Sequence, residues 1–195
     1  IQVLEARNII LAAGSKPFML PLPGMDLKGV LSSDELFKLE EMPESLVIIG
    51  GGVISVEFAT AFSALGCKVT ILEAMPRLVP NMDKEISQSL KMLLKKRDID
   101  VHTSAGVQSV EERDGAYVCK YTEKEKECEA SAQYVLCAVG RIPNTEGLFA
   151  EDAVPEMERG RIVVDEHFKT SIPGVYAIGD LIKGMQLAHT ASAQG

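Results

Sequence analysis

Short apolar runs alternate along the first half of the chain with stretches that repeat at helical spacing. The runs "LVII" (46–49), "KVTILE" (68–73) and "IDVHT" (99–103) have the length and the β-branched residues of buried strands. Between the first two runs, apolar residues recur every three to four positions, which predicts an amphipathic helix: Ile54, Phe58, Phe62 and Leu65.

A second helix is predicted between the last two runs. Asn81 and Asp83 are residue types that begin helices, and an apolar stripe follows them at Ile86, Leu90, Leu93 and Leu94. A shorter helix is expected to open at Ser33. Strand, helix, strand, helix, strand is the order of one half of a doubly wound sheet, so the sequence predicts a parallel, Rossmann-like α/β fold.

The pattern then changes to alternating segments. Asp114 and Gly115 form a hairpin signal, and the charged run 123–127 is expected to form a second hairpin tip. The run 133–139 returns to a buried strand, so an antiparallel β-meander is expected to interrupt the parallel sheet. Further strand-like runs occur near both ends, "NIILAA" (8–13) and "RIVVDEHFKTSIPGVYAIGD" (161–180).

The stretch "VIIGGGVISVEF" (47–58) joins the first strand of the predicted sheet to the first helix through three glycines. Such a turn lets the backbone approach a phosphate, and the N–H groups of the first helical turn then face the anion. Ser55 stands where glycine or alanine is usual, and its hydroxyl can bond to a carbonyl one turn earlier. A glycine triplet by itself is also compatible with a tight turn that holds no ligand.

An acidic residue follows this turn at the distance that dinucleotide-binding folds use. Glu73 ends the second strand, about twenty residues after the glycines. Its carboxylate can accept hydrogen bonds from a ribose and would repel the 2′-phosphate of NADP. Arg77 lies nearby in sequence and complicates this preference. The sequence therefore favours NAD as the nucleotide.

The chain is acidic, with a net charge of -8, which argues against nucleic acid and anionic membrane surfaces as partners. No apolar run approaches the roughly 18 residues of a membrane span. The four cysteines form no CxxC pair, and we interpret them as buried thiols of a cytoplasmic protein: Cys67, Cys119, Cys128 and Cys137. No metal site is predicted.

Five motifs resemble those of the flavoprotein disulfide reductases, most closely the dihydrolipoamide dehydrogenases. They are the glycine-rich segment already described and, in the order of that family, "NIILAAGSKPFMLPLPG", "VLCAVGRIPNTEGL", "TSIPGVYAIGDL" and "QLAHTASAQG". The resemblance implies an NAD-binding domain at 43–145 between two partial segments of an FAD domain, 1–42 and 146–195. The strand-like runs of these two segments, "NIILAAG" and "RIVVDEHF…VYAIGD", are expected to pair with each other or to lie in a contact between chains.

The resemblance also implies roles for individual residues. Those expected to bind NAD are Gly50, Gly51, Gly52, Val53, Ile54, Ser55, Glu57, Glu73, Val107 and Gly140. Those expected to contact FAD are Ala13, Gly14, Ser15, Asp180, Gln186, Leu187, Ala188 and His189. Without the resemblance, Glu57 reads as a helix-dipole residue, Asp180 as a turn or cap residue, and His189 as a surface or packing histidine.

The implied parent protein is a homodimer that oxidises dihydrolipoamide, free or on a lipoyl domain, and reduces NAD through FAD and a redox-active disulfide. The chain has no catalytic residue of that reaction, so by itself it is predicted to be inactive and able to self-associate. NADH oxidases, CoA-disulfide reductases and mercuric reductases share the two nucleotide motifs and remain alternatives. A non-catalytic nucleotide-binding module is the alternative of another class.

Overall fold

The computed structural model describes residues 2–195, so Ile1, with which the predicted segment 1–42 begins, lies outside the described residues. The chain divides into two compact units, one formed by Pro17–Gly140 and the other by the residues before it together with Arg141–Gly195.

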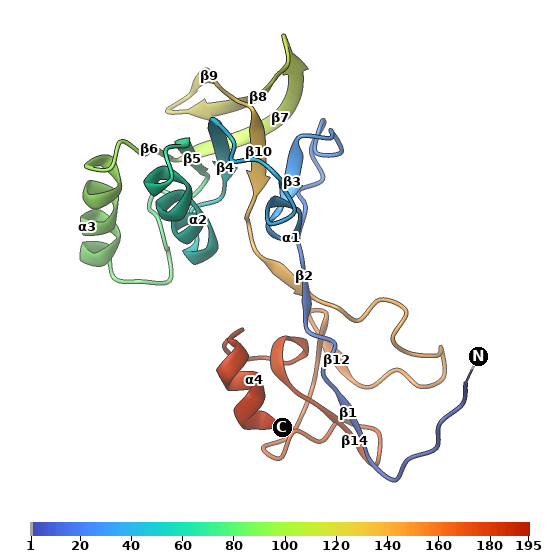
Figure 1. Ribbon diagram of the computed structural model, residues 1–195. Coiled ribbons are helices and arrows are strands. Elements are labelled where there is room, and N and C mark those ends of the chain that lie inside the picture. Colours follow the sequence, from blue (N-terminus) through green and yellow to red (C-terminus); the bar gives the residue numbers. More distant parts are fainter. Residues whose placement is uncertain (1) are drawn as a thin grey trace. The chain divides into compact units, whose positions relative to one another are not determined.

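The unit Pro17–Gly140 contains a five-stranded parallel sheet (Figure 1). In spatial order its strands are β3 (Val30–Ser32), β10 (Tyr134–Cys137), β4 (Ser45–Ile49), β5 (Lys68–Glu73) and β6 (Asp100–Thr103). Both faces of this sheet are covered. In β4, Leu46 and Ile48 pack into one hydrophobic cluster, while Val47 and Ile49 pack into another on the opposite face.

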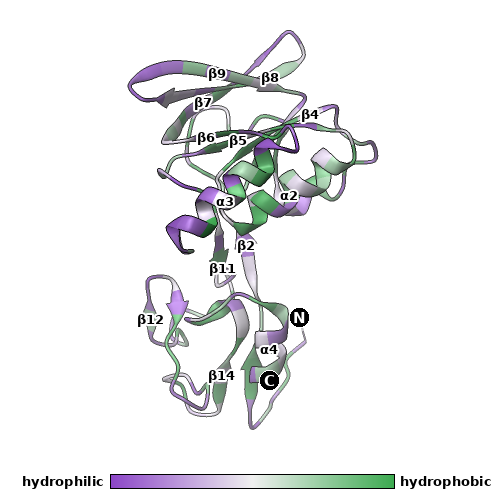
Figure 2. Ribbon diagram, turned by 90° about the vertical axis from the view of Figure 1, so that its left-hand side faces the viewer, coloured by the Kyte–Doolittle hydropathy of each residue, from purple (hydrophilic) through white to green (hydrophobic). Residues whose placement is uncertain are grey.

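Helices cover the face that carries Leu46 and Ile48. They are α1 (Ser33–Leu36), α2 (Val53–Ala64) and α3 (Lys84–Lys95). Residues of α2 are largely hydrophobic, whereas α3 mixes hydrophobic with charged positions (Figure 2). Helix α1 begins at Ser33, as predicted, and Ser32 caps it. Ser32 and Glu35 form a capping box: the Glu35 N–H donates to Ser32 Oγ at 3.3 Å, and the Ser32 N–H donates to Glu35 Oε2 at 2.8 Å.

The apolar stripe predicted for α3 is only partly right. Leu94 is buried and Leu90 packs against the same hydrophobic cluster. Ile86 and Leu93 instead remain exposed, because the helix meets the sheet over a narrower face than its spacing suggested.

The opposite face of the sheet is covered by the antiparallel meander that the sequence predicted. It consists of β7 (Ala105–Arg113), β8 (Ala116–Glu123) and β9 (Lys126–Ala132). Asp114 and Gly115 form the first turn, both with positive φ. The second hydrophobic cluster includes Val110, Cys119 and Tyr121 from the meander together with Val47, Ile49 and Leu72 from the sheet.

The other unit builds its strands in pairs. Strand β1 (Ile9–Leu11) pairs in parallel with β14 (Val175–Ala177). The predicted pairing between the strand-like runs near the two ends of the chain is therefore present. Strand β2 (Ser15–Pro17) pairs with β11 (Arg141–Pro143), and β12 (Met157–Glu158) pairs with β13 (Arg161–Ile162).

The same unit ends with two short helical elements. A 3₁₀ helix, η1, spans Gly179–Leu181, and α4 spans Ala188–Gln194. A small cluster around Ile162, Ala177 and Leu181 is buried here. None of the helices within residues 2–195 is both long and apolar enough to cross a membrane.

Candidate functional site

The first glycine of the predicted turn shows why a side chain is excluded there. Gly50 follows β4 with φ +108, a conformation that favours glycine, and its N–H donates to Leu72 O at 2.8 Å. A Cβ at this position would lie 2.6 Å from Ala138 O on the neighbouring strand segment. The turn between β4 and α2 therefore requires glycine on both conformational and steric grounds.

The second glycine brings Glu73 to the turn across 22 positions of sequence. The Gly51 N–H donates to Glu73 Oε2, and the Met75 N–H donates to Glu73 Oε1 at 2.6 Å. A Cβ at Gly51 would lie 2.7 Å from both Glu73 Oε2 and Leu78 Cδ2. The Glu73 residue is only 7% exposed, so two backbone donors hold its carboxylate in place beside the glycines.

The third glycine has an open environment. Gly52 is the N-cap of α2, and a Cβ added there would meet nothing within 4 Å. No side-chain cap bonds to the start of α2, and its first turn carries no acidic residue. The first N–H groups of α2 thus face a space that a phosphate could enter, with no carboxylate from that turn to repel it.

Ser55 lies directly behind this turn and is completely buried. Its hydroxyl donates to Ala138 O at 3.2 Å. The expectation that it would bond to a carbonyl one turn earlier in its own helix is therefore wrong. The side chain finds its acceptor 83 positions away in sequence, because the end of β10 passes beside the start of α2.

The other residues predicted to bind NAD lie on several elements of the same unit. Val53 and Glu57 are exposed on α2, and Ile54 packs against the hydrophobic cluster beneath that helix. Val107 lies on β7 opposite Tyr121 of β8. Gly140 follows β10 with φ +136, and its carbonyl accepts from the Phe18 N–H at 3.0 Å.

The second unit joins two of the residues predicted to contact FAD. The Ser15 hydroxyl donates to Asp180 Oδ2 at 2.6 Å, although the two residues are 165 positions apart. Arg141 donates from Nε to Ser15 Oγ at 2.9 Å and from Nη2 to Ser15 O at 2.7 Å. Sequence reasoning gave Arg141 no role, and its place in the "GRIPN" segment was the only signal for it.

The remaining residues predicted to contact FAD lie near the surface. Ala13 is exposed and Gly14 is half-buried, and the Gly14 carbonyl accepts from the Asn144 N–H at 2.9 Å. Four more are exposed at the start of α4, where Leu187 is the N-cap: Gln186, Leu187, Ala188 and His189.

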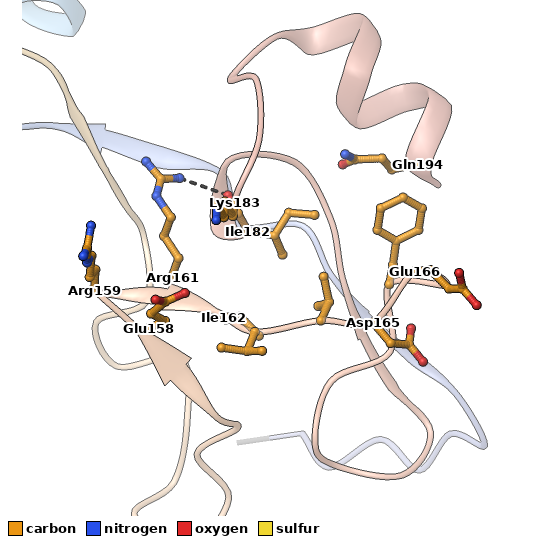
Figure 3. Close-up of a pocket in the computed structure, with 12 residues that line it drawn as sticks. Glu158, Arg159, Arg161, Ile162, Asp165, Glu166, Ile182, Lys183 and Gln194 are labelled. Atoms are coloured by element: carbon orange, nitrogen blue, oxygen red, sulfur yellow. Dashed lines mark hydrogen bonds between the residues drawn. The ribbon is translucent and has the colours of Figure 1, made fainter.

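A cavity of about 680 Å³ in this unit lies elsewhere (Figure 3). Its lining includes Glu158, Arg161, Lys183 and Gln194, and Arg161 donates to Ile182 O at 3.0 Å. None of the residues predicted to bind NAD or FAD lines this cavity. The glycine turn is therefore the candidate site, and this cavity is not part of it.

All four cysteines are free thiols. Burial raises the pKa of Cys67 to about 11 and that of Cys119 to about 12, and burial also raises the pKa of Cys137. Because the thiolate is the reactive form, these three residues have little nucleophilic character near neutral pH. They fit the interpretation of buried structural thiols.

Comparison with known proteins agrees with the motifs. A family model described as pyridine nucleotide-disulphide oxidoreductase matches residues 2–195. The chain belongs to this family. A dihydrolipoyl dehydrogenase of Bacillus subtilis (strain 168) is 38% identical over 194 residues, and that of Geobacillus stearothermophilus is 39% identical over 195 residues. These matches cover the whole of this chain but only 42% and 41% of the two relatives.

Solved structures of a flavoprotein disulfide reductase and of an NADH oxidase have the same fold. The Cu(II) complex of the HOCl-induced flavoprotein disulfide reductase RclA from Escherichia coli superposes with a TM-score of 0.89 at 30% identity, over 96% of this chain and 42% of that one. The water-forming NADH oxidase of Lactobacillus brevis, bound to NADH, gives 0.85 at 21% identity, over 96% and 44%. The predicted mixed α/β fold with a parallel sheet is confirmed.

Proposed function

We propose that the chain supplies the NAD(H)-binding part of a dihydrolipoyl dehydrogenase-like flavoenzyme, with its NAD-binding domain at 43–145. The observation that carries this proposal is the glycine turn, where Gly52 opens onto free space and two backbone N–H groups hold Glu73 beside it. Such a turn provides N–H donors for a pyrophosphate and a carboxylate acceptor for the ribose hydroxyls.

Different residues would bind different parts of an extended dinucleotide. The turn at 50–55 would bind the pyrophosphate, and Glu73 would accept from the adenosine ribose with the lone pairs that Gly51 and Met75 leave free. Val107 would line the adenine side, and Glu57 and Gly140 the nicotinamide side. When bound, NAD supplies the hydride acceptor or donor, while the chain's own residues bind and orient it.

For FAD, we propose the segments 1–42 and 146–195 as parts of a second nucleotide-binding domain. The Ser15–Asp180 hydrogen bond supports this assignment, because it joins two residues that are predicted to contact the flavin. Asp180 would accept from hydroxyl groups of the flavin side chain, and Arg141 orients Ser15 beside it. When bound, FAD would supply the redox chemistry, and the residues of the chain would bind and orient it.

For the whole protein, we propose the oxidation of dihydrolipoamide by NAD through FAD and a redox disulfide, in a cytoplasmic homodimer. The dihydrolipoyl dehydrogenases at 38–40% identity support this activity. The free, largely buried thiols of the 195 residues support the view that the chain by itself does not catalyse the reaction.

A calorimetric titration of the 195-residue chain with NADH and NADPH, with FAD in parallel, tests the proposal. We expect NADH to bind in the micromolar range and NADPH to bind much more weakly, because Glu73 would repel a 2′-phosphate. Equal affinity for both nucleotides would contradict the role of Glu73. Absence of NADH binding would contradict the proposed function.

A glycine substitution separates binding from folding. Gly52→Ala adds a methyl group where the structure has open space, so we expect unchanged stability but at least tenfold weaker NADH binding, since the methyl would occupy the phosphate approach. Gly106→Ala in β7 is the matched control, because a Cβ there also meets nothing within 4 Å. If both variants bind NADH as well as the wild type, the turn does not hold the pyrophosphate.

A further inference from the structure

The hydrogen bond between Ser55 and Ala138 joins two parts of the candidate site. Ser55 is 0% exposed and Ala138 is 8% exposed, and the hydroxyl donates to the carbonyl at 3.2 Å. Ser55 belongs to the first turn of α2, immediately after the glycines. Ala138 is the first residue after β10 ends at Cys137.

The segment 138–140 lies beside the glycine turn. The Ala138 N–H still donates to Ile49 O at 2.9 Å, but the strand ends there. The Ala138 carbonyl points toward Gly50, since a Cβ on that glycine would lie 2.6 Å from it. Two residues later, Gly140 has φ +136, and its carbonyl accepts from the Phe18 N–H.

We propose that Ser55 is a positioning residue that fixes the segment 138–140 against the glycine turn. This inference rests on the proposed function, in which the turn binds the pyrophosphate and Gly140 lies by the nicotinamide. The Ser55 hydroxyl then sets the separation between the two places where the dinucleotide is held. A glycine or alanine at position 55 would allow the helix to pack but would leave the buried Ala138 carbonyl without this donor.

The geometry distinguishes this role from general helix packing. Loss of a hydroxyl that only packs α2 on the sheet would weaken the pyrophosphate turn, and every ligand that uses the turn would be affected alike. Loss of a hydroxyl that positions 138–140 affects the nicotinamide half selectively. NADH and ADP-ribose share the adenosine and pyrophosphate groups, and only NADH carries the nicotinamide ring, so the pair separates the two roles.

The same helix offers a matched control. Ser63 lies on α2, and its hydroxyl donates to Arg97 O at 3.0 Å, also to a carbonyl outside the helix. Ser63→Ala therefore removes the same kind of hydrogen bond from the same helix at its other end. The test compares wild type, Ser55→Ala and Ser63→Ala by calorimetric titration of the 195-residue chain with NADH and with ADP-ribose.

We expect Ser55→Ala to weaken NADH binding by roughly three- to tenfold, the scale of one neutral hydrogen bond, while ADP-ribose affinity changes by less than about twofold. Ser63→Ala should leave both affinities unchanged. Without any ligand, hydrogen exchange of the Ala138 amide and of the Phe18 amide, which donates to Gly140, should become faster in Ser55→Ala only.

Three results would overturn the inference. Equal losses for NADH and ADP-ribose would assign Ser55 to helix packing, and unchanged affinities with unchanged exchange would show that the hydroxyl positions nothing. If the wild type binds neither ligand, the proposed function fails and the role of Ser55 toward a dinucleotide fails with it. Binding by the wild type together with an unaffected Ser55→Ala variant contradicts only the role of Ser55.

Discussion

The runs "NIIL" (8–11) and "LVII" (46–49) are similar in sequence, but they are buried to different degrees in the two units. In β4, Leu46 and Ile48 are 0% exposed, because neighbouring strands flank them and layers cover both faces of the sheet. In β1, Ile9 and Ile10 are 48% and 57% exposed, because β1 pairs only with β14. Apolar character thus predicts a strand, while the number of covering layers decides how much that strand contributes to stability.

Truncation of one isoleucine in each run tests this difference and should give the largest effect. We expect Ile48→Ala to lower the free energy of unfolding by about 2–5 kcal/mol, since it leaves a cavity in a fully packed core. Ile10→Ala should cost less than about 1 kcal/mol, because much of its side chain is already in water. Urea denaturation measures both, and equal losses would contradict the comparison.

Two glycines in the Pro17–Gly140 unit extend the comparison between closely packed and open positions. Gly50 and Gly66 both have positive φ, +108 and +95, so alanine is strained at either position. A Cβ at Gly50 would also overlap Ala138 O, whereas one at Gly66 meets nothing within 4 Å. We expect Gly50→Ala to cost about 1–3 kcal/mol more than Gly66→Ala, because the overlap forces the neighbouring strand to move.

That excess is measured by urea denaturation of the two variants side by side. NADH binding of Gly66→Ala should equal that of the wild type, since Gly66 closes the far end of α2. Equal stabilities of the two variants would show that the end of β10 can move to accept a side chain at position 50. Close packing around the turn would then not explain the glycine there.

The smallest effect is expected where the parallel sheet meets the meander. His102 of β6 places Nδ1 2.8 Å from Glu123 Oε2 and Nε2 3.1 Å from Asp100 Oδ2, and its ring lies 5.5 Å from the Tyr121 ring. Burial lowers the pKa of His102, but the hydrogen bonds to Glu123 and Asp100 outweigh this, so the pKa is raised above its ordinary value. Other charged groups line the same groove, namely Lys68, Asp98 and Glu129.

Because the folded pKa is raised, protonated His102 stabilises the fold. This contribution is fully present below the ordinary pKa of 6.5 and is lost as the pH rises through the higher folded value. We expect His102→Gln to lower the thermal midpoint more in mildly acidic than in mildly alkaline buffer. Scans of both proteins across this range measure the difference, and a gap that stays constant or widens with pH would contradict the role of the imidazolium.

Local sequence determined much of this protein. The alternation of apolar runs and helical spacing, the Asp114–Gly115 turn, and the glycine triplet followed by Glu73 all depend on residues close together in the chain, and the structure contains each of them. These features follow from backbone conformation and side-chain periodicity, which act over a few residues at a time.

Only the tertiary structure decided the rest. Strand β3, which is too short to show alternation, became part of the parallel sheet. Ile86, on the predicted apolar stripe of α3, remained exposed. The tertiary structure also gave Ser55 its acceptor in Ala138 and joined Ser15 to Asp180. These contacts depend on which strand ends lie side by side, and that order arises from packing of the whole sheet and its layers, which no local pattern encodes.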